Sequence, residues 1–175
     1  MSSEMDRLVD EISNAARKAF IDLFKNKESY YYCVLLTTGE AHAPYISAWS
    51  WEALARESEK QSNLLKYSYA DSPYCLYGYD DYFSRVVEMF DERPAMDFND
   101  EKGWDIEFNF RYNAMISALK RLDDEGLFSL NQARDKLLLN VEIMDESEDI
   151  LINSAKLFNN SEAVISEYAN WCAQA

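Results

Sequence analysis

The residue best suited to acid–base chemistry is His42, the only histidine in the 175-residue chain. It lies in the segment Thr37–Pro44, where Gly39 predicts a turn. A Ser–His–acid or Cys–His constellation would have to use this imidazole, because such catalysis needs a base beside the nucleophile. Nothing around it has the pattern of a nucleophile elbow, and a histidine-based zinc or iron site usually needs two or more histidines. We therefore interpret His42 as a turn residue and predict no catalytic residues.

Carboxylates are abundant enough to build a metal site or an acid–base pair. The segment Asp97–Gly103 superficially resembles a calcium loop, but it lacks the alternating ligands and the late glutamate of an EF-hand. The segment Asp145–Asp149 is denser in acids and follows no ligand spacing. The four glycines, at positions 39, 78, 103 and 126, are too dispersed to form a phosphate-binding loop. We predict neither a metal nor a cofactor, and carboxylate chemistry would require acids that converge in one apolar-walled pocket.

The balance of charge restricts the classes of partner. The chain has 32 acidic and 17 basic residues, which gives a formal net charge of −15. A field of that sign repels phosphate backbones and anionic membranes, so we predict neither direct nucleic-acid binding nor membrane docking. It favours encounter with a protein that has a basic surface, because complementary charge speeds association. The alternative is that the acidity only keeps the protein soluble.

The acids gather in two stretches. Residues 80–107 hold ten carboxylates against three basic side chains, and residues 142–149 hold five with no base. We predict that the first stretch supplies a partner-binding surface, with nearby tyrosines adding contact area at small entropic cost. The predicted site residues are Tyr77, Tyr79, Asp91, Glu92, Asp97, Asp100 and Glu101. The alternative is that these acids only solvate a loop, and residues 142–149 are the second candidate surface.

Apolar periodicity predicts the elements that would position these residues. Strands are expected at 30–37, 43–49 and 137–144, with a further short strand and a packed loop within 64–78. Helical spacing predicts helices over about 4–27, 51–60, 79–90 and 104–124, another ending at 158, and a last one capped by Ser161.

These elements predict an α+β fold in a single domain, residues 1–175. We expect one small, mainly antiparallel sheet of three to four strands, packed by about five to six helices. The strands at 30–37 and 137–144 should form its buried centre. The three cysteines, Cys33, Cys75 and Cys172, have no metal or disulfide spacing. With no leader-like or membrane-spanning stretch, a cytoplasmic protein is expected.

The order of several short segments resembles that of a bacterial family, domain-of-unknown-function family 4303. The resembling segments are Tyr32–Glu40, Lys66–Ser68 with Tyr77 and Gly78, Leu119–Phe128, Leu137–Asp145 and Ile150–Leu157. The resemblance implies no activity and no catalytic residues to transfer. Small acidic families of this kind are similar in character to immunity proteins, which neutralise a toxin encoded beside them. The favoured hypothesis is such a non-enzymatic binding protein; the alternatives are a carboxylate-based, metal-dependent hydrolase and a decoy that mimics nucleic acid.

Overall fold

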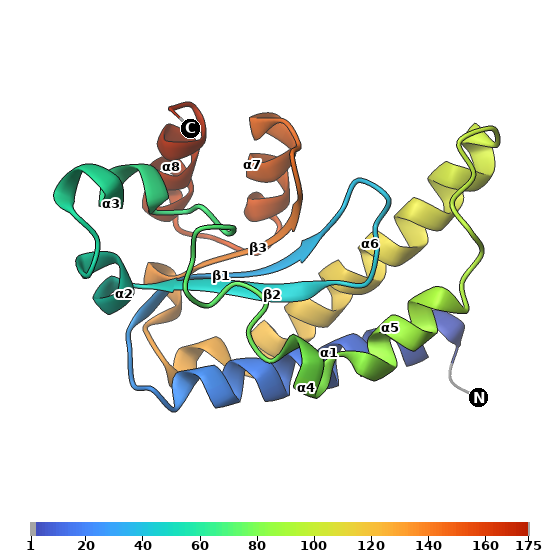
Figure 1. Cartoon of the computed structure of the whole chain (residues 1–175), viewed down its shortest axis with the longest axis horizontal. Coiled ribbons are helices and arrows are strands. Elements are labelled where there is room, and N and C mark those ends of the chain that lie inside the picture. Colours follow the sequence, from blue (N-terminus) through green and yellow to red (C-terminus); the bar gives the residue numbers. More distant parts are fainter. Residues whose placement is uncertain (1–2, 175) are drawn as a thin grey trace.

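A three-stranded sheet separates two layers of helices (Figure 1). The computed structural model describes residues 3–174, so residues 1, 2 and 175 of the predicted domain lie outside it. The strands are β1 (Tyr30–Thr37), β2 (Tyr45–Ser50) and β3 (Leu138–Ile143), in the order β2-β1-β3. β1 pairs antiparallel with β2 and parallel with β3.

Eight α-helices and two 3₁₀ turns lie within residues 3–174. Helices α1, α4, α5 and α6 lie on one side of the sheet, and α7 and α8 lie on the other, with α2 and α3 at one end (Figure 1). The α-helices are α1 (Glu4–Phe24), α2 (Trp51–Ala55), α3 (Glu59–Leu65), α4 (Tyr79–Tyr82), α5 (Ser84–Asp91), α6 (Glu101–Asp124), α7 (Glu148–Lys156) and α8 (Glu162–Cys172). The 3₁₀ turns are η1 (Phe128–Leu130) and η2 (Arg134–Lys136).

The α+β class is confirmed, but the prediction of a mainly antiparallel sheet is wrong. The sheet is mixed, and β3 is an edge strand beside the central β1. The segment before β3 explains the parallel pairing, because it is fixed beside the start of β1. Asn131 accepts a hydrogen bond from the backbone N–H of Tyr30 at 2.9 Å, and Gln132 donates one to the Tyr30 carbonyl at 2.9 Å. The chain therefore enters β3 at the end of the sheet where β1 begins.

The helices are more numerous than predicted, because two of the expected helices are each divided in two. The helix expected over 51–60 is two helices, because Ser50 caps α2 and Ser58 caps α3 with side-chain hydrogen bonds. The helix expected over 79–90 is also two, α4 and α5, with Phe83 between them. The strand expected within 64–78 is absent, and that segment holds the end of α3 followed by turns. The Ser72 hydroxyl of this segment donates a hydrogen bond to the Ala48 carbonyl of β2.

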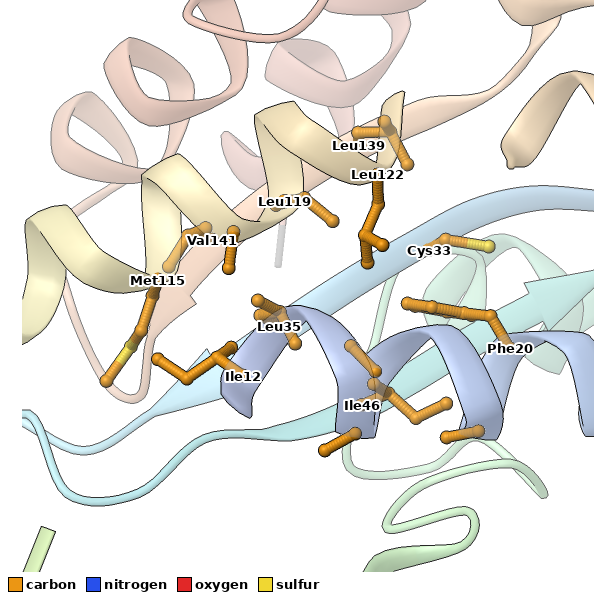
Figure 2. Close-up of a cluster of buried hydrophobic side chains, with 14 of the residues drawn as sticks. Ile12, Phe20, Cys33, Leu35, Ile46, Met115, Leu119, Leu122, Leu139 and Val141 are labelled. Atoms are coloured by element: carbon orange, nitrogen blue, oxygen red, sulfur yellow. The ribbon is translucent and has the colours of Figure 1, made fainter. Parts of the chain in front are cut away.

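The face of the sheet under α1 and α6 is apolar. Leu35 of β1 and Val141 of β3 are paired in register, and both are fully buried. Figure 2 shows them facing Ile12 of α1 and Met115 of α6. Burial of such side chains is the main stabilising contribution to a core of this kind.

The opposite face is covered by α7 and α8 and carries polar groups. Tyr32 and Leu36 of β1 point to this side, as do Asn140 and Glu142 of β3. All four are at most 2 % exposed. The two sides of one sheet therefore bury different chemistry.

Candidate functional site

Three of the predicted partner-binding acids, Asp97, Asp100 and Glu101, come together at the start of α6. This end of the helix projects away from the sheet (Figure 1). All three side chains are exposed, and Asp105 joins them one turn further along. We call residues 97–106 the acidic tip.

The backbone at the acidic tip is held by its own carboxylates. Asp97 accepts a hydrogen bond from the backbone N–H of Asn99 at 2.9 Å, and Asp100 caps α6 by accepting from Gly103 N–H at 3.0 Å. A β-carbon at Gly103 would lie 2.1 Å from an Asp100 carboxylate oxygen, so a larger residue there would require the Asp100 side chain to shift. Asp97 and Asp100 therefore shape the tip, whereas Glu101 and Asp105 are exposed without such a role.

The acidic tip also exposes apolar side chains that the sequence analysis did not assign to a binding surface. Phe98 is 78 % exposed and Ile106 is 63 % exposed. The Phe98 ring stacks on Trp104, with 4.6 Å between the ring centroids. The signal available in the sequence was the placement of three large apolar residues inside a strongly acidic run.

An ion-pair network fixes the base of the acidic tip. Glu107 accepts hydrogen bonds from Arg93 at 2.6 and 2.8 Å and from Arg111 at 2.7 Å. Arg111 also donates to the Pro94 carbonyl at 2.8 Å, which ties the preceding loop to α6. Burial raises the pKa of Glu107, but the hydrogen bonds from the two arginines more than offset it, and the pKa lies below its usual value. These contacts hold the loop before α6 in place against the helix.

The other predicted site residues lie elsewhere. Asp91 ends α5 and Glu92 follows it, and both are exposed below the tip. Tyr77 and Tyr79 lie at the start of α4, apart from the tip (Figure 1). Tyr77 donates a hydrogen bond to Asp22 of α1 at 3.1 Å, and Tyr79 stacks on buried Phe83. The structure therefore does not bring these tyrosines beside the clustered acids, because they pack against the core.

A second candidate site is a cavity of about 530 Å³ over the polar face of the sheet. Its walls come from α8, the start of α7, the end of β3 and the segment after α3. Asp145 adopts a left-handed backbone conformation, φ 59°, which acidic residues tolerate better than most, and so turns the chain from β3 into α7. The lining includes Tyr69, Glu142, Asp145, Tyr168 and Trp171.

The carboxyl group of Glu142 lines this cavity while remaining almost completely buried. Tyr168 donates a hydrogen bond to Glu142 Oε1 at 2.7 Å. Burial raises the pKa of Glu142 from 4.5 to about 7, although the hydrogen bond from Tyr168 favours the charged form. A carboxyl group with this pKa can change protonation state near neutral pH, which is the usual property of a functional acid.

Two polar atoms beside Glu142 have no hydrogen-bond partner among the described residues: the Tyr32 hydroxyl and Asn140 Oδ1. The side chains of both residues nevertheless lie within hydrogen-bonding reach of Glu142, and both lower its pKa. Burial, followed by the charge of Glu142, raises the pKa of Tyr32 well above its usual value. The side-chain nitrogen of Asn140 donates a hydrogen bond to the Leu151 carbonyl at 3.0 Å. The side-chain oxygen of Asn140 can still accept one. Unpaired buried polar atoms are rare in proteins and often mark a functional site.

The remaining candidates offer little chemistry. His42 is exposed in its turn and accepts or donates a hydrogen bond with Thr38 at 2.7 Å. No group of three or more His, Cys, Asp or Glu side chains within residues 3–174 is arranged to hold a metal ion. Over the same residues, no helix is both long and apolar enough to cross a membrane. The three cysteines are free thiols, and Cys33 is fully buried.

Comparison with known proteins supports the resemblance noted in the sequence. No curated protein and no solved structure matches the chain. Residues 12–160 match the family model described as "domain of unknown function (DUF4303)". That range contains all three strands and every helix from α2 to α7, including the acidic tip and Glu142. The chain therefore belongs to the DUF4303 family.

Proposed function

We propose that this protein is a non-enzymatic binding domain that docks a basic partner protein on its acidic tip. The observation that carries the proposal is the exposed Phe98 ring, stacked on half-buried Trp104 among four carboxylates. Large aromatic side chains supply most of the binding energy at many interfaces, and surrounding charges guide the encounter. The partner would present an apolar pocket for Phe98, surrounded by lysine or arginine side chains.

The support under the tip favours binding without rearrangement. The Arg93–Glu107–Arg111 network and the Asp100 cap hold the loop and the first turn of α6 in place. Less conformational entropy is lost when such a surface is occupied, so more of the contact energy contributes to affinity. The net charge of −15 adds long-range attraction toward a basic surface.

Site-specific cross-linking in cells would identify the partner. A photoreactive phenylalanine analogue at position 98 should give a defined adduct with one basic protein. Leu130 is the matched control position, because it is also 78 % exposed and lies just after the opposite end of α6. The same adducts at both positions would show that the cross-links only report exposure.

The affinity between the purified protein and its partner would then test the contributions of the Phe98 ring and of the tip acids. Phe98→Ala should weaken binding by about 30-fold, the effect of losing an aromatic anchor. The double variant Glu101→Lys, Asp105→Lys should mainly slow association, and the wild-type association rate should fall steeply with salt. These two acids are chosen because reversing Asp100 would also remove the α6 cap, at about 1 kcal/mol. The matched control is Asp124→Lys, Asp135→Lys, which changes the charge equally at exposed positions away from the tip. Wild-type binding by both tip variants would refute this interface.

The immunity-protein form of the hypothesis depends on the partner being a toxin, and the cross-linked adduct would decide that. The hydrolase alternative has one supporting observation, the raised pKa of Glu142 in a cavity. A hydrolytic activity that is lost in Glu142→Gln but retained in Glu146→Gln would favour it. The nucleic-acid decoy requires a DNA-binding or RNA-binding partner, which the same adduct would reveal.

A further inference from the structure

We propose that the cavity between α7, α8 and residues 67–69 binds an organic cation, an ammonium or guanidinium group carried on an apolar body. The site is separate from the acidic tip and does not depend on the protein-binding proposal. Its volume, about 530 Å³, lies within the range of ordinary small-ligand pockets.

The floor of the cavity holds a buried carboxyl group without a neighbouring cation. Glu142 is 2 % exposed and lines the cavity, Tyr168 donates a hydrogen bond to its Oε1 at 2.7 Å, and no basic side chain is among the described lining residues. An ammonium or guanidinium group carries several N–H donors and no acceptor, so it would donate hydrogen bonds to the Glu142 carboxylate. It would also neutralise the buried carboxylate, which makes those hydrogen bonds strong.

The walls suit the rest of such a ligand. Tyr67, Tyr69, Tyr168 and Trp171 surround the cavity with aromatic surface. The faces of tyrosine and tryptophan rings attract cations and also bury an apolar chain. Tyr67 packs edge-on against both Tyr168 and Trp171, at centroid distances of 5.3 and 5.8 Å, so these three rings are held in place.

The mouth of the cavity selects against anions. Asp145, Glu146 and Glu148 line it, and no basic side chain is among its lining residues. A phosphate or carboxylate ligand would meet four acids and no compensating cation, which is unfavourable at close range. The acids at the mouth would instead raise the local concentration of cations.

Calorimetric titration with three probes of similar shape tests the class of ligand. The probes are 2-phenylethylamine, 2-phenylethanol and 3-phenylpropionate, which are cationic, neutral and anionic. We expect the amine to bind at least about ten-fold more tightly than the alcohol, with no binding of the carboxylate. Equal binding of amine and alcohol, or no heat from the amine up to about 10 mM, would overturn the proposal.

Two variants separate the charge from the ring surface. Glu142→Gln keeps the shape of the side chain and should weaken amine binding by about ten-fold or more while leaving alcohol binding unchanged. Tyr69→Leu, at a half-buried position, should weaken it by about two- to five-fold. Glu162→Gln, at an exposed acid of α8 that does not line the cavity, is the matched control. Wild-type amine affinity in Glu142→Gln would contradict the proposal, and Tyr69→Leu keeps the test available should Glu142→Gln not fold.

The pH dependence of binding gives an independent readout. The titratable groups close to Glu142 are Tyr32, Tyr69, Tyr112, Tyr168, Cys172, Asp145 and Glu148. Because the cation needs the ionised form of Glu142, whose pKa is about 7, the affinity should fall by about 30-fold between pH 8 and pH 5.5. The same titration should be nearly flat in Glu142→Gln. An equally steep fall in that variant would assign the effect to another group and overturn the role of Glu142.

The cation could belong to a free small molecule or to the side chain of a peptide. Titration with the capped tripeptides acetyl-Gly-Lys-Gly-amide and acetyl-Gly-Arg-Gly-amide distinguishes these sources. Tighter binding of phenylethylamine than of both peptides would assign the site to a free amine. Tighter binding of either peptide would assign it to a basic side chain of another protein, through the same chemistry.

Discussion

Two glutamates are buried within residues 3–174, and their surroundings shift their pKa values in opposite directions. Glu107 of α6 is 6 % exposed and lies between Arg93 and Arg111, which lower its pKa. Glu142 of β3 is 2 % exposed and has no cation beside it, and its pKa rises to about 7. The first carboxylate is neutralised by two arginines, whereas the second accepts a hydrogen bond from the uncharged hydroxyl group of Tyr168. The contrast separates a structural acid from a candidate functional one.

The largest loss of stability is expected when a new carboxylate is buried with no cation or hydrogen-bond donor beside it. Leu35→Asp would place one in the apolar face of the sheet, and Val141→Asp would place one directly opposite, since the two positions pair in register. Burying an unpaired charge there costs more than the total stability of a domain of this size, so both variants should be unfolded at 25 °C. Near-ultraviolet circular dichroism and thermal melting would show this. Leu130→Asp, at an exposed position, should melt like the wild type, and a cooperative melt of Leu35→Asp would mean that the core tolerates charge.

A smaller loss of stability is expected when Glu107, which is paired with two arginines, is replaced. Glu107→Gln keeps the size of the side chain but leaves Arg93 and Arg111 without their charged partner. Breaking a buried pair in this way should lower the free energy of unfolding by about 3–5 kcal/mol at pH 7. Because the folded-state pKa lies below the unfolded value of 4.5, this contribution is present above pH 4.5 and is lost as the pH falls further. Urea titrations at pH 7 and pH 3.5 would test it, with Glu101→Gln as the exposed control on the same helix.

For Glu142 we expect stability to depend on pH in the opposite direction. Its folded-state pKa of about 7 exceeds the unfolded value of 4.5, so the folded protein holds a proton that the unfolded chain releases between these pH values. This group therefore lowers stability as the pH rises from 4.5 to 7, by about 3 kcal/mol in total. Glu142→Gln should match the wild type near pH 4.5 and be more stable above pH 7. A constant difference between the two proteins from pH 4.5 to 8 would show that Glu142 does not titrate in this window.

Local sequence signals were sufficient to predict the features that depend on residues close together in the sequence. The uninterrupted apolar run from Tyr30 to Leu36 correctly predicted a strand buried on both faces. Ser161 caps α8 as expected, Ser50 caps α2, and Gly126 follows α6 with φ 79°. Each of these features depends on one residue and its neighbours within a few positions.

Long-range features could not be predicted in the same way. Asn140 and Glu142 alternate with Leu139 and Val141, a pattern typical of a half-buried strand, and Glu142 was grouped with a candidate surface. Helices α7 and α8 cover that polar side, and nothing within β3 indicates it. The parallel pairing of β3 likewise depends on Asn131, whose contact with Tyr30 joins residues about 100 positions apart. The clustered acids of the tip were predicted from local density, but Tyr77 was placed with them although it packs on α1.

The smallest change in stability is expected when the two hydroxyl groups next to Glu142 are removed. These variants test how many hydrogen bonds the Glu142 carboxyl group receives from the protein. Tyr168→Phe removes the donor to Glu142 and should lower stability by about 1.5–3 kcal/mol at pH 8, where the carboxylate is charged, and by less at pH 5.5. Tyr32→Phe removes a buried hydroxyl that has no partner among the described residues, so the change should lie within about 1 kcal/mol of zero and can be stabilising.

The pair of variants is well matched, because both replace a fully buried tyrosine beside the same carboxyl group. Urea titrations of both at pH 8 and pH 5.5 give four free energies that can be compared directly. A loss in Tyr32→Phe as large as that in Tyr168→Phe would mean that the Tyr32 hydroxyl already donates to Glu142. The floor of the cavity would then be satisfied within the protein, as Glu107 is, and its need for an external donor would disappear.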